Sequence, residues 1–352
     1  MIDKYLNKNL LDFKAYKAVV PAEKTILASN ESPFNLMDDP EFRSGYIEVI
    51  EKLNLNRYPD PNANKLRTEL ALYTGVNPEN IIVGNGADEV IDLILSTFIN
   101  PGDVVITHSP SFEMYSISAK AKGARCIRVP DVEHEIDVDE IIDKANFLKA
   151  KMLFLCIPNN PTGYNVPIND VQKIIDETSC LVILDMAYIE FSEEDYSSLE
   201  LNERVIRLRT LSKAFGLASL RVGYGIANEE IIDAINLIKP PYNLNQLSQD
   251  LAAYTVKNRE LLADKIALLK SEKERVYEAF RDINNVKVFP TGANFLLVKI
   301  EDEKINKFNS YLKANDIKVK IFSEESGMNG YYRITVGKPE ENNLIIQGLK
   351  NL

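Results

Sequence analysis

Lys213 has the sequence setting of a lysine that acts as a nucleophile. It lies in segment 210–216, among small and apolar residues that follow an expected strand at 205–208. Such surroundings disfavour the charged ammonium group and so favour the free amine. A free amine is what a lysine needs to form an imine with a carbonyl compound. The alternative is an exposed lysine with a solvated ammonium group, and this segment alone leaves that alternative open.

Three further side chains would suit such chemistry. Asp185 ends a very apolar run, where a carboxylate can face a cationic partner or cap a helix. Tyr188 follows three residues later and can lie beside it. Arg221 comes eight residues after Lys213, and its planar fork suits a phosphate. Together these residues supply an amine, an acid and an anion-binding group.

Two turns contain the glycines and prolines that are typical of ligand-binding loops. The sequence Gly-Asn-Gly-Ala-Asp-Glu at 84–89 opens a helix, whose free N–H groups suit a phosphate. A plain turn with an aspartate cap is the alternative. The sequence Pro-Asn-Asn-Pro-Thr-Gly at 158–163 follows a strand, at the end where open α/β sheets bind ligands. Its alternative is a rigid surface turn.

The apolar patterning around these motifs predicts an open, mostly parallel α/β sheet flanked by helices. Short segments rich in branched residues alternate with amphipathic segments through the middle of the chain. The expected strands are 81–83, 104–107, 125–129, 152–157, 181–184, 205–208 and 222–226, and the expected helices include 88–98, 112–122 and 169–177.

In the last third of the chain the pattern changes. Apolar residues from Leu262 to Phe280 recur on one face of a long helix, for which a short coiled coil is the rival interpretation. Later segments predict the strands of a smaller α+β unit, at 294–300, 317–321 and 332–336. We therefore expect a large domain at 31–244. A second unit would combine an N-terminal arm, 1–30, with a small substrate domain, 245–352.

The composition limits the kinds of partner. The 352 residues carry 41 basic and 52 acidic side chains, and the net charge of −11 gives no general attraction to nucleic acid or anionic membranes. No apolar run approaches the roughly 20 residues of a membrane span, and no signal peptide is apparent, so we expect a cytoplasmic protein. The three cysteines and two histidines share no metal-site spacing, which favours buried free thiols and no metal.

The order of these motifs resembles that of the class I/II (fold-type-I) aminotransferases, which depend on pyridoxal phosphate. The shared set is Asn-Asn-Pro-Thr-Gly at 159–163, Asp185, Tyr188, Ser212-Lys213 and Arg221. Segment 207–224 is also similar to the lysine segment of the histidinol-phosphate aminotransferase family. Supporting matches extend over nearly all of the chain, at 56–60, 84–89, 114–116, 188–191 and 332–337.

The resemblance implies a complete site for pyridoxal 5'-phosphate. Lys213 would hold the cofactor covalently and move a proton between substrate and cofactor, while Asp185 would pair with the pyridinium nitrogen. Tyr188 and Asn160 would form hydrogen bonds with the 3′-oxygen of the cofactor ring. Phe112 would stack on the ring, where the family has a tyrosine. The cofactor phosphate would meet Gly86, Ala87, Asp88, Thr210, Ser212, Arg221 and, from the other subunit of a homodimer, Tyr58.

The resemblance also implies which residues bind the substrate. Arg333 would take the amino-acid carboxylate, with Asn30 beside it. A substrate phosphate would meet Lys320 and Tyr16. The family has an arginine in place of Lys320, and lysine lacks its bidentate fork; a solvated strand lysine is the alternative. The chain departs from the family at two other motifs. It has Asn-Glu-Ser-Pro at 30–33 where the family has Asn-Glu-Asn-Pro, and Asp-Met-Ala-Tyr at 185–188 where the family has Asp-Glu-Ala-Tyr.

The implied activity is transfer of an amino group between glutamate/2-oxoglutarate and histidinol phosphate/imidazole acetol phosphate, a step of histidine biosynthesis. Three other functions stay open: an aromatic amino acid aminotransferase, a threonine-phosphate decarboxylase-like enzyme, and a non-catalytic binding module that kept the fold. The intact set of Lys213, Asp185 and Arg221 argues against the last. The expected partners are small-molecule substrates and a second copy of the chain, without nucleic acid or membrane.

Overall fold

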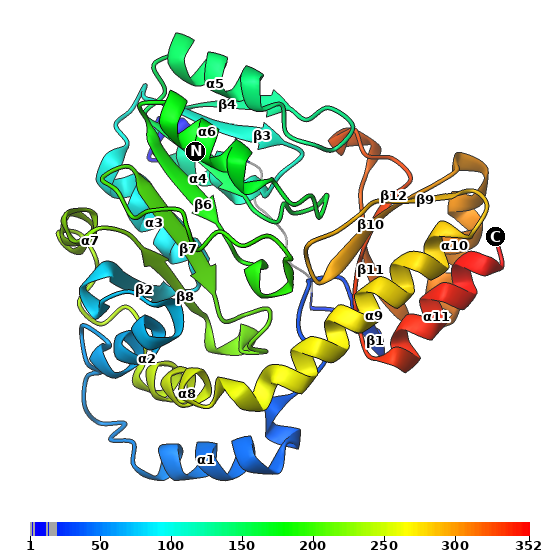
Figure 1. Cartoon of the computed structure of the whole chain (residues 1–352), viewed down its shortest axis with the longest axis horizontal. Coiled ribbons are helices and arrows are strands. Elements are labelled where there is room, and N and C mark those ends of the chain that lie inside the picture. Colours follow the sequence, from blue (N-terminus) through cyan, green and yellow to red (C-terminus); the bar gives the residue numbers. More distant parts are fainter. Residues whose placement is uncertain (1, 3, 12, 14–19) are drawn as a thin grey trace.

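A computed structural model describes residues 2, 4–11, 13 and 20–352, which form two sheets surrounded by helices (Figure 1). The strands of the larger sheet are β2 (Ile81–Asn85), β3 (Val104–Ser109), β4 (Arg125–Pro130), β5 (Met152–Cys156), β6 (Leu181–Asp185), β7 (Val205–Thr210) and β8 (Val222–Ile226). All the strands predicted for the middle of the chain are present. Their order is β2-β8-β7-β6-β5-β3-β4.

The prediction of a mostly parallel sheet is confirmed. The pairs β3–β4, β3–β5, β5–β6 and β6–β7 are parallel, and β8 alone in this sheet runs antiparallel to its neighbours, β2 and β7. Every residue of β5 is buried, as expected for a strand covered on both faces. Leu153 and Leu155 contribute to the apolar cluster on one face, and Met152 and Phe154 to that on the other.

Helices cover both faces of this sheet, and together they make up what we call the large unit. Apolar residues of α3 and α4 pack on one face, and those of α5 and α6 pack on the other. The helices are α1 (Pro40–Glu51), α2 (Asn64–Thr74), α3 (Ala87–Phe98), α4 (Glu113–Ala121), α5 (Val138–Phe147), α6 (Ile168–Glu177), α7 (Glu229–Asn236) and α8 (Gln246–Lys257). Short 3-10 turns are η1 (Lys8–Leu10), η2 (Leu36–Asp38), η3 (Pro78–Asn80), η4 (Ile189–Phe191), η5 (Ala218–Leu220), η6 (Arg259–Leu262) and η7 (Glu324–Ser326).

The second sheet and three helices form the small unit. Its strands are β1 (Thr25–Leu27), β9 (Val286–Val288), β10 (Phe295–Ile300), β11 (Ile317–Ile321) and β12 (Tyr331–Thr335), and its helices are α9 (Ala263–Arg281), α10 (Asp302–Ala314) and α11 (Pro339–Lys350). The helices bury one face of the sheet, including Leu296 and Val298 of β10, whereas Leu297 and Arg333 lie on the other face. The predicted long helix is present as α9. The sequence reading did not include β1 and β9.

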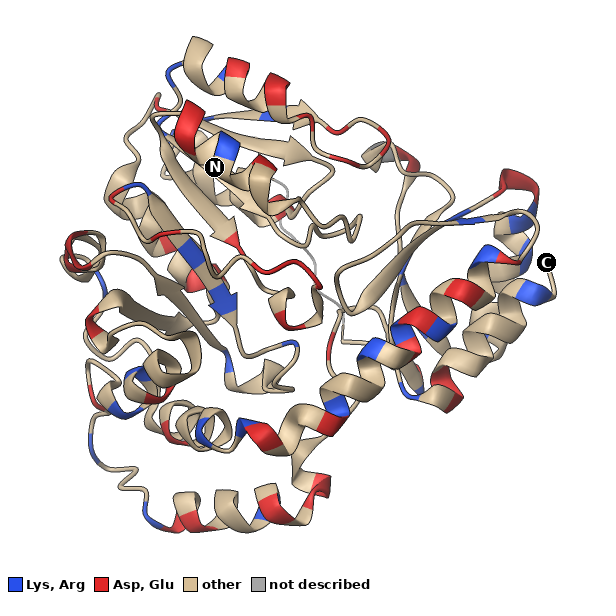
Figure 2. Ribbon diagram, in the orientation of Figure 1, with Lys and Arg blue, Asp and Glu red and all other residues tan. Residues whose placement is uncertain are grey.

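The N-terminal segment joins the small sheet, because β1 pairs in parallel with β11. Helix α8 packs against α1 and α2 of the large unit, and α9 then runs to the small sheet (Figure 1). The predicted division of the chain after residue 244 stays a prediction. Along α9, basic and acidic residues alternate rather than gathering in one block of a single sign (Figure 2). Within the described part of the chain, no helix is both long and apolar enough to cross a membrane.

Candidate active site

The carboxyl ends of four strands and the beginning of β8 lie at one edge of the large sheet. β5, β6 and β7 are parallel, and β2 runs in their direction because both β2 and β7 are antiparallel to β8. β8 runs the opposite way, so its first residue, rather than its last, lies at this edge. Open α/β sheets bind ligands at the carboxyl ends of their strands. The residues that this topology brings to the edge are Asn85, Cys156, Asp185, Thr210 and Val222.

Lys213 follows β7 at this edge and is half-buried. Its Nζ donates a hydrogen bond to the Ser29 carbonyl oxygen at 2.8 Å. Burial, and next the positive charge of Arg333, lower the pKa of Lys213 to about 8. The amine is therefore much more available near neutral pH than that of an ordinary lysine.

Asp185 is the last residue of β6 and is buried. Burial raises its pKa to about 6, against the opposing effect of hydrogen bonds from the Tyr115 hydroxyl and the Ala187 N–H. The Tyr115 hydroxyl donates to Oδ2 at 2.5 Å, and the Ala187 N–H donates to Oδ1 at 3.1 Å. A cation placed beside this carboxylate would stabilise its charged form and so lower the pKa toward its ordinary range.

Tyr188 lies between the two units. Its hydroxyl accepts hydrogen bonds from Asn30 Nδ2 at 3.0 Å and Asn160 Nδ2 at 3.3 Å. Lys213 Nζ is 5.9 Å from the centre of its ring. Burial raises the pKa of Tyr188 well above that of a free tyrosine, so the hydroxyl stays protonated and can donate to a ligand. The structure therefore brings Lys213, Tyr188, Asn160 and Asn30 together.

Asn30 connects the N-terminal segment to the small sheet. Its backbone has a φ of 55°, in the left-handed region that asparagine tolerates better than most residues. Its N–H donates to Thr335 Oγ1 at 2.9 Å, and its carbonyl accepts from Asn294 Nδ2 at 3.1 Å. Thr335 and Asn294 were not singled out from the sequence, since only the pairing of distant segments gives them this role.

The N-terminus of α3 and the start of β8 form an anion-binding corner. Gly86 precedes α3 with a φ of 84°, and no side chain caps the helix, so its first N–H groups face outward. A Cβ at Gly223 would collide with the Ala87 backbone nitrogen, so only glycine lets the two elements approach this closely. Arg221 Nη2 lies 3.2 Å from Asp88 Oδ2 at this corner.

Two buried hydroxyl groups complete the corner. Thr210 Oγ1 donates to Ser212 Oγ at 3.0 Å and accepts from the Ser212 N–H at 3.1 Å.

Phe112 lies at the start of α4, and its ring meets Tyr115 edge-on, with 5.4 Å between ring centres. Tyr115 is a residue of this site that no local sequence motif indicates. Its position on α4, facing the end of β6, is set by packing rather than by any local pattern.

Arg333 extends from β12 of the small unit into the same region. Its Nη1 donates to Asn160 Oδ1 of the large unit, and its Nη2 donates to the Ala28 carbonyl at 2.8 Å. Lys320 is its cross-strand partner on β11, so both side chains lie on one face of the small sheet. Lys320 is exposed, and its Nζ is 5.6 Å from the centre of the Phe322 ring.

None of the hydrogen bonds described above involves Tyr58. Tyr58 is 80% exposed and stacks on Tyr242 with 4.5 Å between ring centres. Tyr16 lies outside the described residues. Cys156 and Cys180 are buried free thiols as expected, but Cys126 is only partly buried because β4 is an edge strand. Among the described residues, no cluster of histidine, cysteine and carboxylates could hold a metal ion.

Comparison with known proteins extends the likeness over the whole chain. A model of the family described as aminotransferase class I and II matches residues 22–349. The histidinol-phosphate aminotransferase of Thermoanaerobacter sp. (strain X514) is 41% identical, with 100% of this chain and 99% of that protein covered. The structure of histidinol-phosphate aminotransferase from Clostridium acetobutylicum has a TM-score of 0.83 at 27% identity, covering 93% and 98% of the two chains.

A further solved structure supports the fold. It is the histidinol-phosphate aminotransferase from Sinorhizobium meliloti in complex with pyridoxal-5'-phosphate, with a TM-score of 0.88 at 21% identity. The superposition covers 98% of this chain and 96% of that one. The likeness therefore extends over nearly the whole fold.

Proposed function

Because the chain belongs to the aminotransferase class I and II family, we propose that it transfers an amino group between glutamate/2-oxoglutarate and histidinol phosphate/imidazole acetol phosphate. It is a pyridoxal-phosphate-dependent enzyme, as the family match over residues 22–349 and a relative that is 41% identical over the full chain indicate. One observation carries the proposal above all. A lysine whose pKa falls to about 8 and a buried carboxylate whose pKa rises to about 6 stand at the same edge of the sheet.

The residues at this edge fit pyridoxal 5'-phosphate. When bound, this cofactor supplies an electron-accepting ring that stabilises negative charge at the substrate Cα. Lys213 would hold the cofactor aldehyde, and Asp185 would face the ring nitrogen as the anionic partner of a charge-assisted hydrogen bond. Tyr188 and Asn160 would donate hydrogen bonds to the ring oxygen. Phe112 would cover one face of the ring.

The anion-binding corner would hold the cofactor phosphate. Arg221 already pairs with a carboxylate there, at an uncapped helix N-terminus where negative charge is favoured. The phosphate would accept hydrogen bonds from the backbone of Gly86, Ala87 and Asp88, from the Thr210 and Ser212 hydroxyl groups, and from Arg221. As a free amine, Lys213 would move the proton at the substrate Cα.

Arg333 would bind the substrate carboxylate. Its guanidinium already donates to Asn160, which also bonds Tyr188, so a carboxylate bound there would lie near Tyr188 and Lys213. Lys320, on the same face of the small sheet, would meet the substrate phosphate. Tyr16 is the second proposed contact for that phosphate.

The substrate assignment predicts different effects for two substitutions. Arg333→Ala should raise KM for both glutamate and histidinol phosphate by about tenfold, because a carboxylate loses a charge-assisted bidentate partner. Lys320→Ala should raise KM about threefold to fivefold for histidinol phosphate only, since an exposed lysine contributes less. Steady-state kinetics with each amino donor measure both effects.

Lys318→Ala is the matched control, because Lys318 lies on the same strand and pairs with Glu23 instead. It should leave both KM values unchanged. If phenylalanine or tyrosine is the better donor and Lys320→Ala has no effect, the chain is an aromatic amino acid aminotransferase. This second function stays open because the chain has Lys320 where the family has an arginine.

We also propose a homodimer in which Tyr58 reaches the cofactor phosphate of the partner subunit. Tyr58 and Tyr242 form an exposed stacked pair, and exposed apolar side chains at Leu237 and Ile238 precede Tyr242 along the chain. The neighbouring Asn243 donates to Glu89 in the first turn of α3 at 2.8 Å. The exposed pair is therefore connected to the anion-binding corner.

Subunit mixing tests this arrangement. Inactive Lys213→Ala chains exchanged with inactive Tyr58→Ala chains should recover about one quarter of wild-type activity. Half of randomly formed dimers are mixed, and each mixed dimer has one site with both native residues. Activity per site is the measurement, after subunit exchange has been verified. A monomer in sedimentation, or verified exchange without recovery, would contradict the shared site.

A further inference from the structure

A tight turn between β4 and α5 extends from the large unit toward the small one. Val132 and Glu135 exchange two backbone hydrogen bonds of 2.9 Å. The residues between them, Glu133 and His134, have φ values of 52° and 76°. Positive φ at both central positions defines a type I′ turn. Residues other than glycine seldom adopt this conformation, so the contacts around the turn must hold it.

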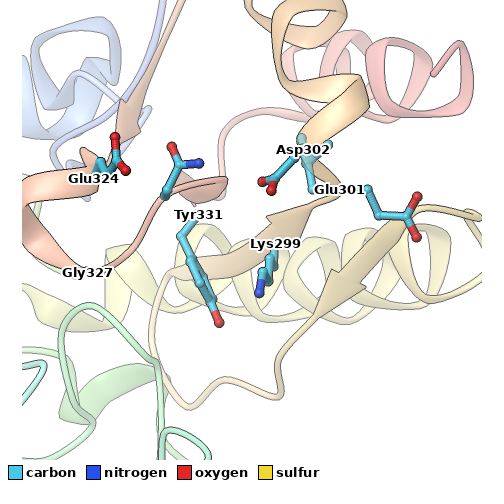
Figure 3. Close-up of a pocket in the computed structure, with 8 residues that line it drawn as sticks. Lys299, Glu301, Asp302, Glu324, Gly327 and Tyr331 are labelled. Atoms are coloured by element: carbon cyan, nitrogen blue, oxygen red, sulfur yellow. The ribbon is translucent and has the colours of Figure 1, made fainter.

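His134 provides such a contact, because its ring lies against two aromatic rings of the small unit. It meets Phe289 edge-on at 4.6 Å and Tyr331 at 5.3 Å between ring centres. His134 Nε2 is also 3.1 Å from the Tyr331 hydroxyl oxygen. Figure 3 shows the Tyr331 side chain extending to the same side of the sheet as that of Lys299, whose Nζ is 5.3 Å from the Tyr331 ring centre.

The small-unit side of this contact is firmly packed. Phe289 and Tyr331 belong to an apolar cluster with the buried side chains of Leu297 and Met328. The cluster lies on the face of the small sheet that the helices leave open, because Leu297 is the register partner of Arg333. His134 therefore contacts the face that also carries the substrate-binding arginine.

The large-unit side of the turn is anchored by a buried pair. Asp131, three positions before His134, donates its N–H to the Ser109 carbonyl at 2.8 Å. Its Oδ1 lies 2.8 Å from His108 Nδ1, and both side chains are 1% exposed. A buried hydrogen-bonded pair of this kind resists movement, because separating it would leave polar groups without partners. The turn therefore extends from a fixed point at the end of β3 and β4.

His134 holds the start of the strand whose middle residue is Arg333. Tyr331 begins β12, and Arg333 follows two positions later on the same face. We propose that His134 is a positioning residue that fixes β12 against the large unit, so that Arg333 can bind the substrate carboxylate while Lys213 reaches the Cα. The effect on substrate rests on the proposed function, but the contact itself is a property of the folded chain.

The test uses the same substitution at two successive positions of the turn. Asparagine accepts a left-handed backbone, so His134→Asn and Glu133→Asn both keep the turn, but only the first removes the ring from between Phe289 and Tyr331. His134→Asn should raise KM for glutamate about tenfold, with a smaller change in kcat, because two aromatic contacts and a hydrogen bond are lost. The backbone amides of β12 should also exchange hydrogen faster.

Glu133→Asn should change neither measurement, since Glu133 is exposed. Tyr331→Phe keeps the ring and loses only the hydroxyl, so its KM and exchange rates should lie between those of wild type and His134→Asn. Equal KM values and equal exchange rates in His134→Asn and Glu133→Asn would overturn the proposal.

Hydrogen exchange is independent of catalysis. If the wild-type protein transfers no amino group, the proposed function fails. The contact is then judged by hydrogen exchange alone: faster exchange of β12 in His134→Asn supports the contact, and unchanged exchange overturns it.

Discussion

Replacing Lys213 by alanine should abolish amino-group transfer, with a loss of at least about 10²–10⁴-fold in kcat, the contribution of a positioned proton-transfer group. No other amine is described at the edge of the sheet beside Asp185 and Tyr188, so none can take over the proton at the substrate Cα. Borohydride reduction followed by peptide mapping should place the cofactor on Lys213 in the wild-type protein and nowhere in the variant. A reduced cofactor found on another lysine would refute the assignment.

The same lysine should show a pH dependence that can be measured without catalysis. Its pKa of about 8 in the folded chain is below the ordinary 10.5. The free amine of the cofactor-free protein therefore increases as pH rises toward about 8 and levels off above it. The rate of labelling by an amine-reactive reagent should rise about tenfold for each pH unit below that pKa.

Lys239 is the matched control for the substitution of Lys213. Burial also lowers its pKa, and its Nζ donates to a backbone carbonyl, that of Pro61, at 3.0 Å. Its hydrogen-bond partners, the Pro61 and Pro240 carbonyl groups, are not residues of the candidate site. Lys239→Met should keep full transferase activity and normal cofactor attachment, which would show that a lowered pKa alone does not make a lysine catalytic.

Asp185→Asn should still bind the cofactor but lose about a hundredfold in the rate of the half-reaction with glutamate. The substitution keeps the shape of the side chain and removes the charge that would stabilise a protonated ring nitrogen, an effect of the size of one strong charge-assisted hydrogen bond. Single-turnover absorbance changes measure this rate. An unchanged rate would mean that Asp185 only caps the residues after β6.

Tyr115→Phe separates the charge of Asp185 from its hydrogen bond. The Tyr115 hydroxyl donates to the carboxylate at 2.5 Å and lowers its pKa, so removing the hydroxyl should raise the pKa of Asp185 further above 6 in the cofactor-free protein. The carboxylate itself remains. The half-reaction should therefore slow much less in Tyr115→Phe than in Asp185→Asn.

The large sheet could be predicted because its strands are buried on both faces. A strand such as β5 then has only apolar residues, and the pattern is visible without knowledge of its neighbours. The motifs at the ends of β5, β6 and β7 are local, so Asn160, Asp185 and Lys213 could be singled out as well. The topology then brings them to one edge of the sheet.

Features that depend on contact between distant segments could not be read in this way. The strands β1 and β9 have three residues each, too few to show a period, and they exist because β11 and β10 pair with them. The role of Tyr115 depends on how α4 packs beside β6. The turn at His134 has no glycine to mark it, and its partner Tyr331 is almost two hundred positions away.

The antiparallel strand β8 also has a consequence for the order in which the protein can assemble. Val83 pairs with Tyr224, about 140 positions later in the chain, and closing so long a loop is slow compared with forming local structure. During synthesis, α3 is made long before Arg221 leaves the ribosome, so the phosphate corner cannot exist until β8 has entered between β2 and β7. Pyridoxal phosphate would then stabilise only chains whose central sheet is complete, by mass action on the native state, and would leave unfinished chains without that protection.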